Sequence, residues 1–334
     1  MSSATSMILV TGGAGYIGSH TVLALVRAGR PVLVLDDLST GHRDAIPAAA
    51  LFIQGSLADR ALLADVFARH KISAILHFAA RSIVGDSMRD PVTYLRDNAA
   101  EFLNLIEIAA KHGAPPIVLS STAALFGRPD RDPIDEDCRI EPGNPYGESK
   151  LYAERALHWA EQAYGLRSIA LRYFNAAGAD AEGLIGEDHR PETHLIPRLL
   201  DVALGRAEKA MIFGTDYPTP DGTCIRDYVH VSDLATAHLL SLDRLLDGGP
   251  SDLFNLGSGL GFSVAEVVAS VRRVTGHPIP AEVAPRRPGD PARLVASSAK
   301  AERLLGWRRD FENLDAIVAS AWAWRKAYPD GFKN

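Results

Sequence analysis

The chain has 334 residues, a formal net charge of −6 and two cysteines. Hydrophobic residues make up 47% and charged residues 23%, which is ordinary for a folded protein and excludes wholesale disorder. At roughly 150 residues per domain, this length predicts about two domains. No apolar run reaches the roughly 18 residues that cross a bilayer, and the mild acidity gives no basic footprint for nucleic acid. We therefore expect neither a membrane nor a nucleic acid among the partners.

The cysteines and the N-terminal residues indicate the cellular compartment in which the protein is expected. Cys138 and Cys224 stand far apart and form no C-x-x-C pair, so neither a disulfide framework nor a zinc site is indicated. The residues before Met7 carry no basic and apolar leader, so we expect no signal peptide. Both features favour a reducing, cytoplasmic location.

Apolar runs and helical patterns alternate over the first 175 residues. Strands that are apolar on both sides, alternating with helices, predict a parallel sheet covered on both faces. The expected fold class is therefore α/β, a Rossmann-type doubly wound sheet. The expected strands are 7–11, 31–36, 51–53, 74–78, 116–120 and 168–174, and the expected helices are 16–28, 59–70, 102–110 and 144–164.

After Asn175, apolar runs and helical patterns no longer alternate regularly. Residues 214–222 are rich in turn formers. Shorter helices are expected at 197–204, 231–246, 264–275 and 314–324. We predict a Rossmann lobe over 7–175 and a smaller mixed α/β lobe over 176–334, with some segments of the second returning to the first.

A glycine motif follows the first expected strand and opens the first expected helix. Gly12, Gly15 and Gly18 form G-x-x-G-x-x-G, in which glycine lets a pyrophosphate approach the helix N-terminus. Asp36 ends the second expected strand, where a carboxylate binds both ribose hydroxyls of NAD and repels the 2′-phosphate of NADP. The glycines alone also fit an ordinary strand–helix turn. Their position, together with Asp36, predicts NAD binding.

Tyr146 and Lys150 lie four residues apart near the start of the helix expected at 144–164, so they share a face. A phenol needs a nearby positive charge to act as a base at neutral pH. Tyr-x-x-x-Lys also arises by chance on exposed helices. Here Thr122 follows the strand at 116–120, at the sheet edge where ligands bind. Tyrosine, lysine, a hydroxyl and an NAD fold together predict alcohol oxidation by hydride transfer.

With these motifs the chain resembles the extended short-chain dehydrogenase/reductase family, and within it the UDP-hexose 4-epimerases. The resemblance runs from about Met7 to about Gly331. Its most specific stretch is Asp-Tyr-Pro-Thr-Pro-Asp-Gly-Thr over 216–223, followed by Arg-Asp-Tyr-Val-His-Val over 226–231.

The resemblance implies an isomerase that reversibly epimerises C4 of a UDP-hexose, UDP-galactose to UDP-glucose, through a 4-keto intermediate. Tyr146 as phenolate would take the 4-hydroxyl proton directly or through Thr122. The C4 hydride would pass to NAD and return to the other face of the turned-over keto sugar. Lys150 would lower the phenol pKa and hold the nicotinamide ribose. The resemblance also implies a homodimer that pairs through helices 95–110 and 144–164.

The residues that follow Thr122 limit which reactions of this family the site can perform. Dehydratases of this family place an Asp-Glu pair after the active-site threonine, and decarboxylases have a Glu in that region. Here Thr122 is followed by Ala123, Ala124 and Leu125, which transfer no protons. Oxidation followed by re-reduction is the chemistry that remains.

Alternatives stay open. The sugar could be an N-acetylated UDP-hexose or a UDP-pentose, because Leu294 stands at a pocket-wall position where some relatives have the larger tyrosine. The enzyme could instead release NADH as a sugar-nucleotide dehydrogenase or reductase. A non-catalytic NAD-binding regulator is a third reading, although such relatives tend to lose the tyrosine or the lysine.

Site residues follow from the resemblance by position. The cofactor set is Gly12, Gly15, Tyr16, Ile17, Gly18, Asp36, Asp37, Leu38, Ser39, Thr40, Gly41, Ser56, Leu57, Phe78, Ala79, Ala80, Ser82, Asn98, Thr122, Tyr146, Lys150 and Phe174. The substrate set is Thr122, Tyr146, Asn175, His194, Leu195, Phe213, Arg226, Arg287, Asp290 and Leu294. Ser56 and Ser82 replace an Asp and a Lys found in relatives, and Arg81 stands next to Ser82 as a substitute for that Lys, so the resemblance leaves the tightness of NAD retention open. No metal site is expected at His189 and His194, because no H-E-x-x-H motif or carboxylate cluster accompanies them.

Overall fold

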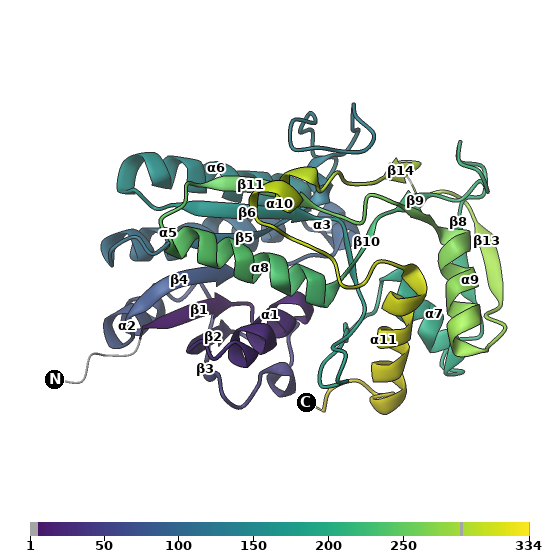
Figure 1. The fold of residues 1–334 in the computed structure, drawn as a ribbon, viewed down its shortest axis with the longest axis horizontal. Helices are drawn as coiled ribbons and strands as arrows, with labels where there is room; N and C mark the ends of the chain where they lie inside the picture. The colour runs from purple at the N-terminus through teal and green to yellow at the C-terminus, as the bar shows by residue number, and fades with distance from the viewer. Residues whose placement is uncertain (1–5, 288–289, 334) are drawn as a thin grey trace.

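A seven-stranded sheet, all of whose neighbouring strands pair in parallel, forms the centre of the larger region of the molecule (Figure 1). The computed structural model describes residues 6–287 and 290–333. The strand order is β11-β6-β5-β4-β1-β2-β3. The strands are β1 (Met7–Thr11), β2 (Val32–Asp36), β3 (Leu51–Gln54), β4 (Ile72–His77), β5 (Ile117–Thr122), β6 (Ser168–Tyr173) and β11 (Asp252–Leu256). This confirms the predicted doubly wound α/β fold. The order reverses between β1 and β4, the place where ligands bind in such sheets.

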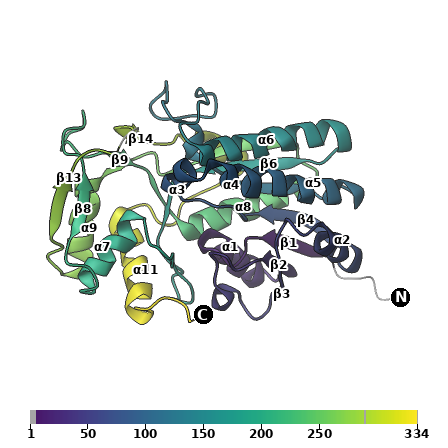
Figure 2. The same cartoon turned by 180° about the vertical axis from the view of Figure 1, so that it is seen from behind.

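Helices cover both faces of the sheet, each over its own hydrophobic core. On one face, Val22, Leu25 and Leu234 pack from α1 and α8 onto the strands. The other face is covered by α2, α5 and α6, which Figure 2 shows. The core on that face includes Phe67 and Phe102. The helices are α1 (Tyr16–Arg27), α2 (Arg60–Arg69), α5 (Glu101–Lys111), α6 (Pro145–Tyr164) and α8 (Val231–Leu246). Apolar residues three and four apart give each helix the buried stripe that this arrangement requires.

A smaller region lies at the carboxyl-terminal end of this sheet, on the right of Figure 1. Its core is built by α7, α9 and α11 and includes Ile196, Val267 and Ile317. Its elements are β7 (Asn175–Ala177), α7 (Leu195–Ala203), β8 (Ala210–Phe213), β9 (Ile225–Arg226), β10 (Tyr228–His230), β12 (Phe262–Ser263), α9 (Val264–Thr275), β13 (Ala281–Ala284), β14 (Arg293–Leu294) and α11 (Leu314–Ala327). β9 joins β12 and β14 in a small sheet, while β8 pairs with β13 and β7 with β10.

The chain passes between the two regions more than once. β11 pairs with β6 at the edge of the large sheet, although it lies far beyond residue 175. α8 packs against α1, and α10 (Ala299–Leu304) contacts β11. The division at residue 175 therefore separates stretches of sequence that share one core.

Some elements were not expected from the sequence. A helical segment runs before α5 as α3 (Val84–Arg89), α4 (Pro91–Leu95) and a π-helical turn (Arg96–Ala100). The Asp90 side chain caps the Pro91 end by accepting from the Thr93 amide. Short 3₁₀ turns occupy Arg43–Ala45 and Ala123–Leu125. Among the described residues, no helix has both the length and the apolar character that a bilayer crossing requires.

Candidate active site

The turn after β1 leaves no room for a side chain. Gly12 has a φ of +73°, and a Cβ there would lie 2.3 Å from the backbone nitrogen of Ala79, beyond the end of β4. A Cβ on Gly18 would lie 2.1 Å from the carbonyl oxygen of Gly12. Gly15 is the N-cap of α1 and supplies no side-chain cap. Because the first amides of a helix lack intrahelical acceptors, this cradle fits a pyrophosphate.

Asp36 ends β2 beside the glycine turn. Its Oδ2 accepts the amide of Ala14 and its Oδ1 accepts the amide of Leu38, each at 2.9 Å. Burial raises the pKa of this carboxyl, while the two backbone amides oppose the shift. Each carboxylate oxygen has capacity for one further hydrogen bond. The group therefore fits a ribose diol, and NAD is the dinucleotide these residues suit.

The other predicted cofactor residues gather at this edge because parallel strands end at the same side of a sheet. Each group follows or closes a strand. Asp37, Leu38, Ser39, Thr40 and Gly41 follow β2, Ser56 and Leu57 follow β3, Phe78, Ala79, Ala80 and Ser82 follow β4, Thr122 ends β5 and Phe174 follows β6.

Asn98 is buried between this edge and α6. Its Oδ1 accepts the amide of Arg81 at 2.7 Å, and its Nδ2 donates to the Ser149 hydroxyl at 3.0 Å. The Arg81 side chain is itself engaged, with Nε 2.5 Å from Asp97. The Ser56 hydroxyl donates to Glu101 at 3.3 Å.

Thr122, Tyr146 and Lys150 are brought together where β5 ends against the start of α6. Asn144 caps this helix by accepting the Gly147 amide at 2.9 Å. The Thr122 side chain lies near enough to the Tyr146 phenol to favour its ionised form. Lys150 is buried, and its Nζ donates to the Ser120 carbonyl at 2.9 Å.

The protonation behaviour of this group is set mainly by burial. Burial raises the pKa of Tyr146. Burial lowers the pKa of Lys150 to about 8, and the charge of Glu154 opposes the fall. The ammonium of Lys150 donates to a backbone carbonyl, and the Thr122 side chain is the neighbour that opposes the rise in the pKa of Tyr146.

Sequence reasoning missed Glu154, whose negative charge opposes the fall in the pKa of Lys150. Glu154, one helical turn further along α6, binds Arg172 of β6 through both carboxylate oxygens, with Nε–Oε1 at 2.9 Å and Nη2–Oε2 at 2.6 Å. Ser121 donates to the same carboxylate at 2.5 Å. The spacing of Glu154 from Lys150 on one helix face was the signal that could have found it.

The predicted substrate residues form two small groups. Arg226 of β9 pairs with Asp290, and Leu294 lies opposite Arg226 in the register of β14. The guanidinium of Arg287 lies 4.2 Å from the ring centre of Phe213.

The remaining members of that set stand at the starts of β7 and α7. Asn175 begins β7 directly after Phe174, and Leu294 and Phe174 pack against the same small apolar cluster. His194 is the N-cap residue of α7, and Leu195 is its first residue.

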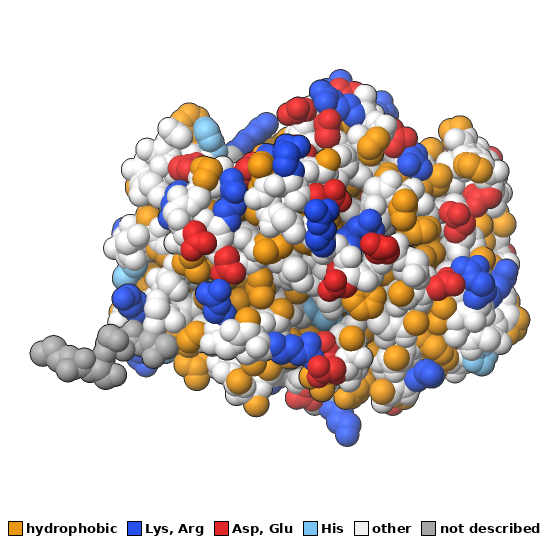
Figure 3. All heavy atoms as spheres, in the orientation of Figure 1, with side chains coloured by type: hydrophobic (Ala, Val, Ile, Leu, Met, Phe, Trp, Pro, Cys, Tyr) orange, Lys and Arg blue, Asp and Glu red, His pale blue; other side chains and the backbone are white. Residues whose placement is uncertain are grey.

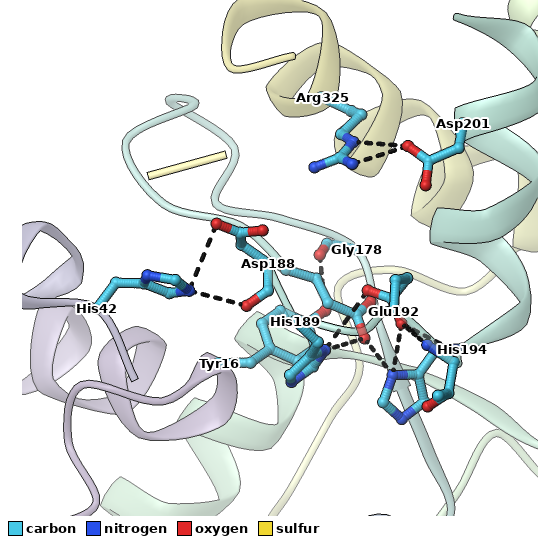
Figure 4. Close-up of polar contacts among 11 residues, drawn as sticks. Tyr16, His42, Gly178, Asp188, His189, Glu192, His194, Asp201 and Arg325 are labelled. Atoms are coloured by element: carbon cyan, nitrogen blue, oxygen red, sulfur yellow. Dashed lines mark hydrogen bonds and ion pairs between the residues drawn. The ribbon is translucent and has the colours of Figure 1, made fainter. Parts of the chain in front are cut away.

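His194 is also part of a group that sequence reasoning did not find. Figure 4 shows His189, Glu192 and His194 directed at one another from the loop before α7. Together with Glu187 they bring four metal-ligating atoms within 4.8 Å of one another. The statement that no carboxylates accompany these histidines was therefore wrong. The repeated Glu-x-His pattern at 187–189 and 192–194 was the available signal.

Comparison with known proteins agrees with this geometry. The chain matches the NAD dependent epimerase/dehydratase family over residues 8–257 and belongs to it. Among curated relatives, it is 53% identical to the UDP-glucose 4-epimerase of Halalkalibacterium halodurans, covering 98% of each chain. It is 49% identical to that of Corynebacterium glutamicum, covering 97% of each.

Solved structures give the same answer. One titled as a crystal structure of UDP-glucose 4-epimerase matches with a TM-score of 0.97 and 54% identity, covering 98% of this chain and 100% of that one. The Bifidobacterium longum UDP-glucose 4-epimerase, solved with NAD+ and UDP, matches with a TM-score of 0.92 and 37% identity, over 98% and 100% of the two chains. The resemblance identified from the motifs is confirmed.

Proposed function

We propose that this protein is an isomerase that interconverts UDP-galactose and UDP-glucose by NAD-dependent epimerisation at C4. The observation that carries this proposal is that Thr122, Tyr146 and Lys150 meet where β5 ends against α6, at the edge where the glycine cradle and Asp36 lie. Ala123, Ala124 and Leu125 after the threonine supply no second acid or base. Relatives at about half identity carry the name of this activity.

NAD, when bound by the glycine turn and Asp36, would supply reversible hydride chemistry at C4. The protein's own residues handle the proton and the orientation. Tyr146 takes the 4-hydroxyl proton, directly or through the neighbouring Thr122 hydroxyl. Lys150 and the bound cofactor contribute positive charge that stabilises the phenolate against the effect of burial. The Gly12–Gly18 turn holds the pyrophosphate, and Asp36 holds the adenosine ribose.

Arg226 and Arg287 are proposed to bind the UDP pyrophosphate, because forked guanidinium donors match its oxygens. On the face shown in Figure 3, basic and acidic side chains are interspersed rather than separated. Attraction of an anionic substrate therefore rests on these local arginines more than on the net charge of −6.

The test is incubation with UDP-galactose and NAD, followed by chromatography of the UDP-sugars. Equilibration with UDP-glucose, without stoichiometric NADH, is expected. Tyr146→Phe is expected to lower the rate about 10²- to 10⁴-fold, because the proton acceptor is lost, with the fold unchanged by circular dichroism. NADH accumulation would instead support a dehydrogenase, and full activity of Tyr146→Phe would exclude this chemistry. A parallel assay with UDP-N-acetylgalactosamine tests whether Leu294 admits the larger sugar.

We further propose a cytoplasmic homodimer. Large apolar side chains stay exposed on neighbouring helices of one region, among them Val92 at 71% and Trp159 at 69%, with Leu103 and Tyr152 also exposed. Exposed apolar side chains of this kind favour a protein partner. The two cysteines are free and buried, which suits a reducing compartment. Light scattering is expected to give twice the chain mass, and a monomer at micromolar concentration would contradict the dimer.

A further inference from the structure

The four residues Glu187, His189, Glu192 and His194, here called the His–Glu cluster, lie outside the catalytic group just described. They occupy the loop that leads into α7. His194 Nδ1 lies 2.9 Å from Glu187 Oε1 and 3.1 Å from Glu192 Oε1. His189 Nδ1 lies 3.3 Å from Glu187 Oε1 and 3.5 Å from Glu192 Oε2. One ligand atom from each of the two imidazoles and two carboxylates lies within 4.8 Å of the other three.

These separations are those of ligands around a small tetrahedral ion. Zinc is bound by histidine nitrogen and carboxylate oxygen at about 2.0 to 2.2 Å. Ligand atoms at the corners of such a tetrahedron lie about 3.3 Å apart. The nitrogen–oxygen distances of the cluster lie on either side of this value.

One nitrogen of the cluster makes no well-formed hydrogen bond. Among the described residues, His189 Nδ1 is a buried polar atom without a hydrogen bond of good geometry, and its contacts with Glu187 Oε1 at 3.3 Å and Glu192 Oε2 at 3.5 Å are ion pairs. Glu192 Oε1, by contrast, already accepts the amides of Thr193 and His194 at 2.7 Å each. This leaves Glu192 Oε2 directed toward His189 Nδ1. A buried nitrogen without a good hydrogen bond, next to a carboxylate oxygen, is a setting in which proteins bind a cation.

Charge balance fits a divalent ion. Two ionised glutamates carry two negative charges, which one divalent cation neutralises while both imidazoles stay neutral and offer lone pairs. The competing arrangement is a cluster of ion pairs with both rings protonated. Burial opposes protonation, but the carboxylates raise the pKa of His189 to about 9 and of His194 to about 10. That arrangement places two like charges on rings whose centres are 5.0 Å apart.

We propose that the His–Glu cluster binds one Zn²⁺ ion as a structural site. Two nitrogen and two oxygen ligands favour zinc over calcium and magnesium, which take oxygen ligands. All four positions are filled by the chain, which is the arrangement of a structural rather than a catalytic zinc.

The position of the His–Glu cluster indicates which part of the structure a bound zinc ion would stabilise. Tyr16, the residue after the cofactor turn, packs edge-on against His189 with ring centres 6.1 Å apart, and its hydroxyl donates to the Gly178 carbonyl at 2.7 Å. His194 caps α7, whose first residue is Leu195. A metal held here ties the loop to the start of α7 next to the cofactor turn. Zinc binding is therefore expected to stabilise the junction of the two regions and to fix the position of His194, which is also a predicted substrate residue.

The experiment uses the full-length protein, stripped with a chelator, dialysed against zinc and then against metal-free buffer. Elemental analysis is expected to find about one zinc per chain. His189→Gln is expected to bind zinc at least tenfold more weakly. His158→Gln removes an exposed histidine from α6 and is the matched control, with zinc content unchanged. Circular dichroism checks that each variant is folded.

Cobalt distinguishes a built site from loose surface binding. The wild-type protein with Co²⁺ is expected to show the strong visible absorption of tetrahedral nitrogen and oxygen coordination, and His189→Gln is expected to lose it. Zinc is also expected to raise the melting temperature of the wild type and not of His189→Gln. If the cluster holds only ion pairs, the wild type should retain no zinc, show no tetrahedral cobalt spectrum and gain no melting temperature from zinc. A wild type that retains no more zinc than His189→Gln, or that gives an octahedral cobalt spectrum, would falsify the proposal. Because none of these measurements involves a UDP-sugar, failure here is separate from failure of the epimerase assignment.

Discussion

The cofactor side and the substrate side of the candidate site are built in different ways. On the cofactor side, Asp36 is buried and bound to two backbone amides, and Asn98 is held through both ends of its amide group. On the substrate side, Arg226 and Asp290 satisfy each other, and Arg287 lies on an aromatic ring. The first side is fixed before any ligand arrives. The second has to exchange its internal contacts for those of a ligand.

The difference follows from the elements that carry each side. The cofactor residues follow strands of four to six residues in one continuous sheet. Arg226 and Leu294 stand on strands of two residues each, β9 and β14. Preorganised contacts save the energy of ordering on binding. Changes on the cofactor side should therefore affect folding, and changes on the substrate side should affect affinity.

The largest effect is expected from Glu154→Ala. Arg172 is 2% exposed and would keep its charge without a carboxylate partner. The free energy of unfolding should fall by about 3 to 5 kcal/mol. Urea denaturation measures this change. Glu148→Ala, an exposed position on the same helix, should change it by less than about 0.5 kcal/mol. Equal effects of the two variants would mean that the Glu154–Arg172 pair is not buried as described.

Gly12→Ala should lower the free energy of unfolding by about 3 kcal/mol, because strain at positive φ adds to overlap with the backbone of Ala79. It should also abolish NAD binding in titration calorimetry. Gly29 has a similar φ of +69° but no neighbouring atom within 4 Å. Gly29→Ala should therefore cost only about 1 kcal/mol from the backbone conformation and leave NAD binding intact. A similar loss in both variants would show that the close approach at Gly12 plays no part.

Lys150 makes stability depend on pH in a defined window. Its pKa is about 8 in the folded protein against 10.5 for the free side chain. Between these values the unfolded chain binds more protons, so stability should rise with pH from about 8 to 10.5. The total rise attributable to Lys150 is up to about 3 kcal/mol. Below pH 8 both states are protonated and this slope vanishes.

The measurement compares urea unfolding of the wild type and Lys150→Met at several pH values without bound nucleotide. Subtracting the unfolding free energy of Lys150→Met from that of the wild type removes the contribution of other groups. The remaining difference should rise between about pH 8 and pH 10.5. A pH-independent difference between the two proteins would contradict the burial of this ammonium.

The smallest effect on folding is expected for Arg226→Ala. Loss of a charge-assisted hydrogen bond to the substrate should raise KM for UDP-galactose roughly tenfold to a hundredfold. The free energy of unfolding should change by less than about 1 kcal/mol, because the pair with Asp290 is partly exposed. Arg273→Ala on α9 breaks an exposed pair with Asp315 of α11 and should alter neither KM nor stability. Steady-state kinetics and melting curves check both. A large loss of stability in Arg226→Ala would remove the contrast between the two sides.

The cofactor side could be predicted from sequence because its signals are local. The apolar periods predicted the alternation of strands and helices along the chain, and the Gly12–Gly18 motif stood at the expected junction. Helices α8 (Val231–Leu246) and α9 (Val264–Thr275) were predicted with the bounds that the structure has. Propensity and periodicity act over a few residues, so they are visible in a single sequence.

The remainder depends on contacts between distant residues. Strands of two residues, such as β9 and β14, are too short to show a period, and they pair across a long stretch of chain. The Glu154–Arg172 pair joins a helix to a strand. The His–Glu cluster lies in a loop, where spacing along the chain does not fix spacing in space. Such contacts arise from the tertiary fold and leave little trace in local pattern.

The placement of β11 has a consequence for how the protein is made. β6 pairs with β5 early in the chain, but its other edge is covered by β11, whose Asp252 stands opposite Ile169. A nascent chain that has emerged only to β6 therefore presents an open strand edge until Leu256 has been synthesised. Open edges are templates for pairing with other chains, and such distant pairing slows folding. The period of synthesis between β6 and β11 is thus the interval in which this protein is most exposed to aggregation.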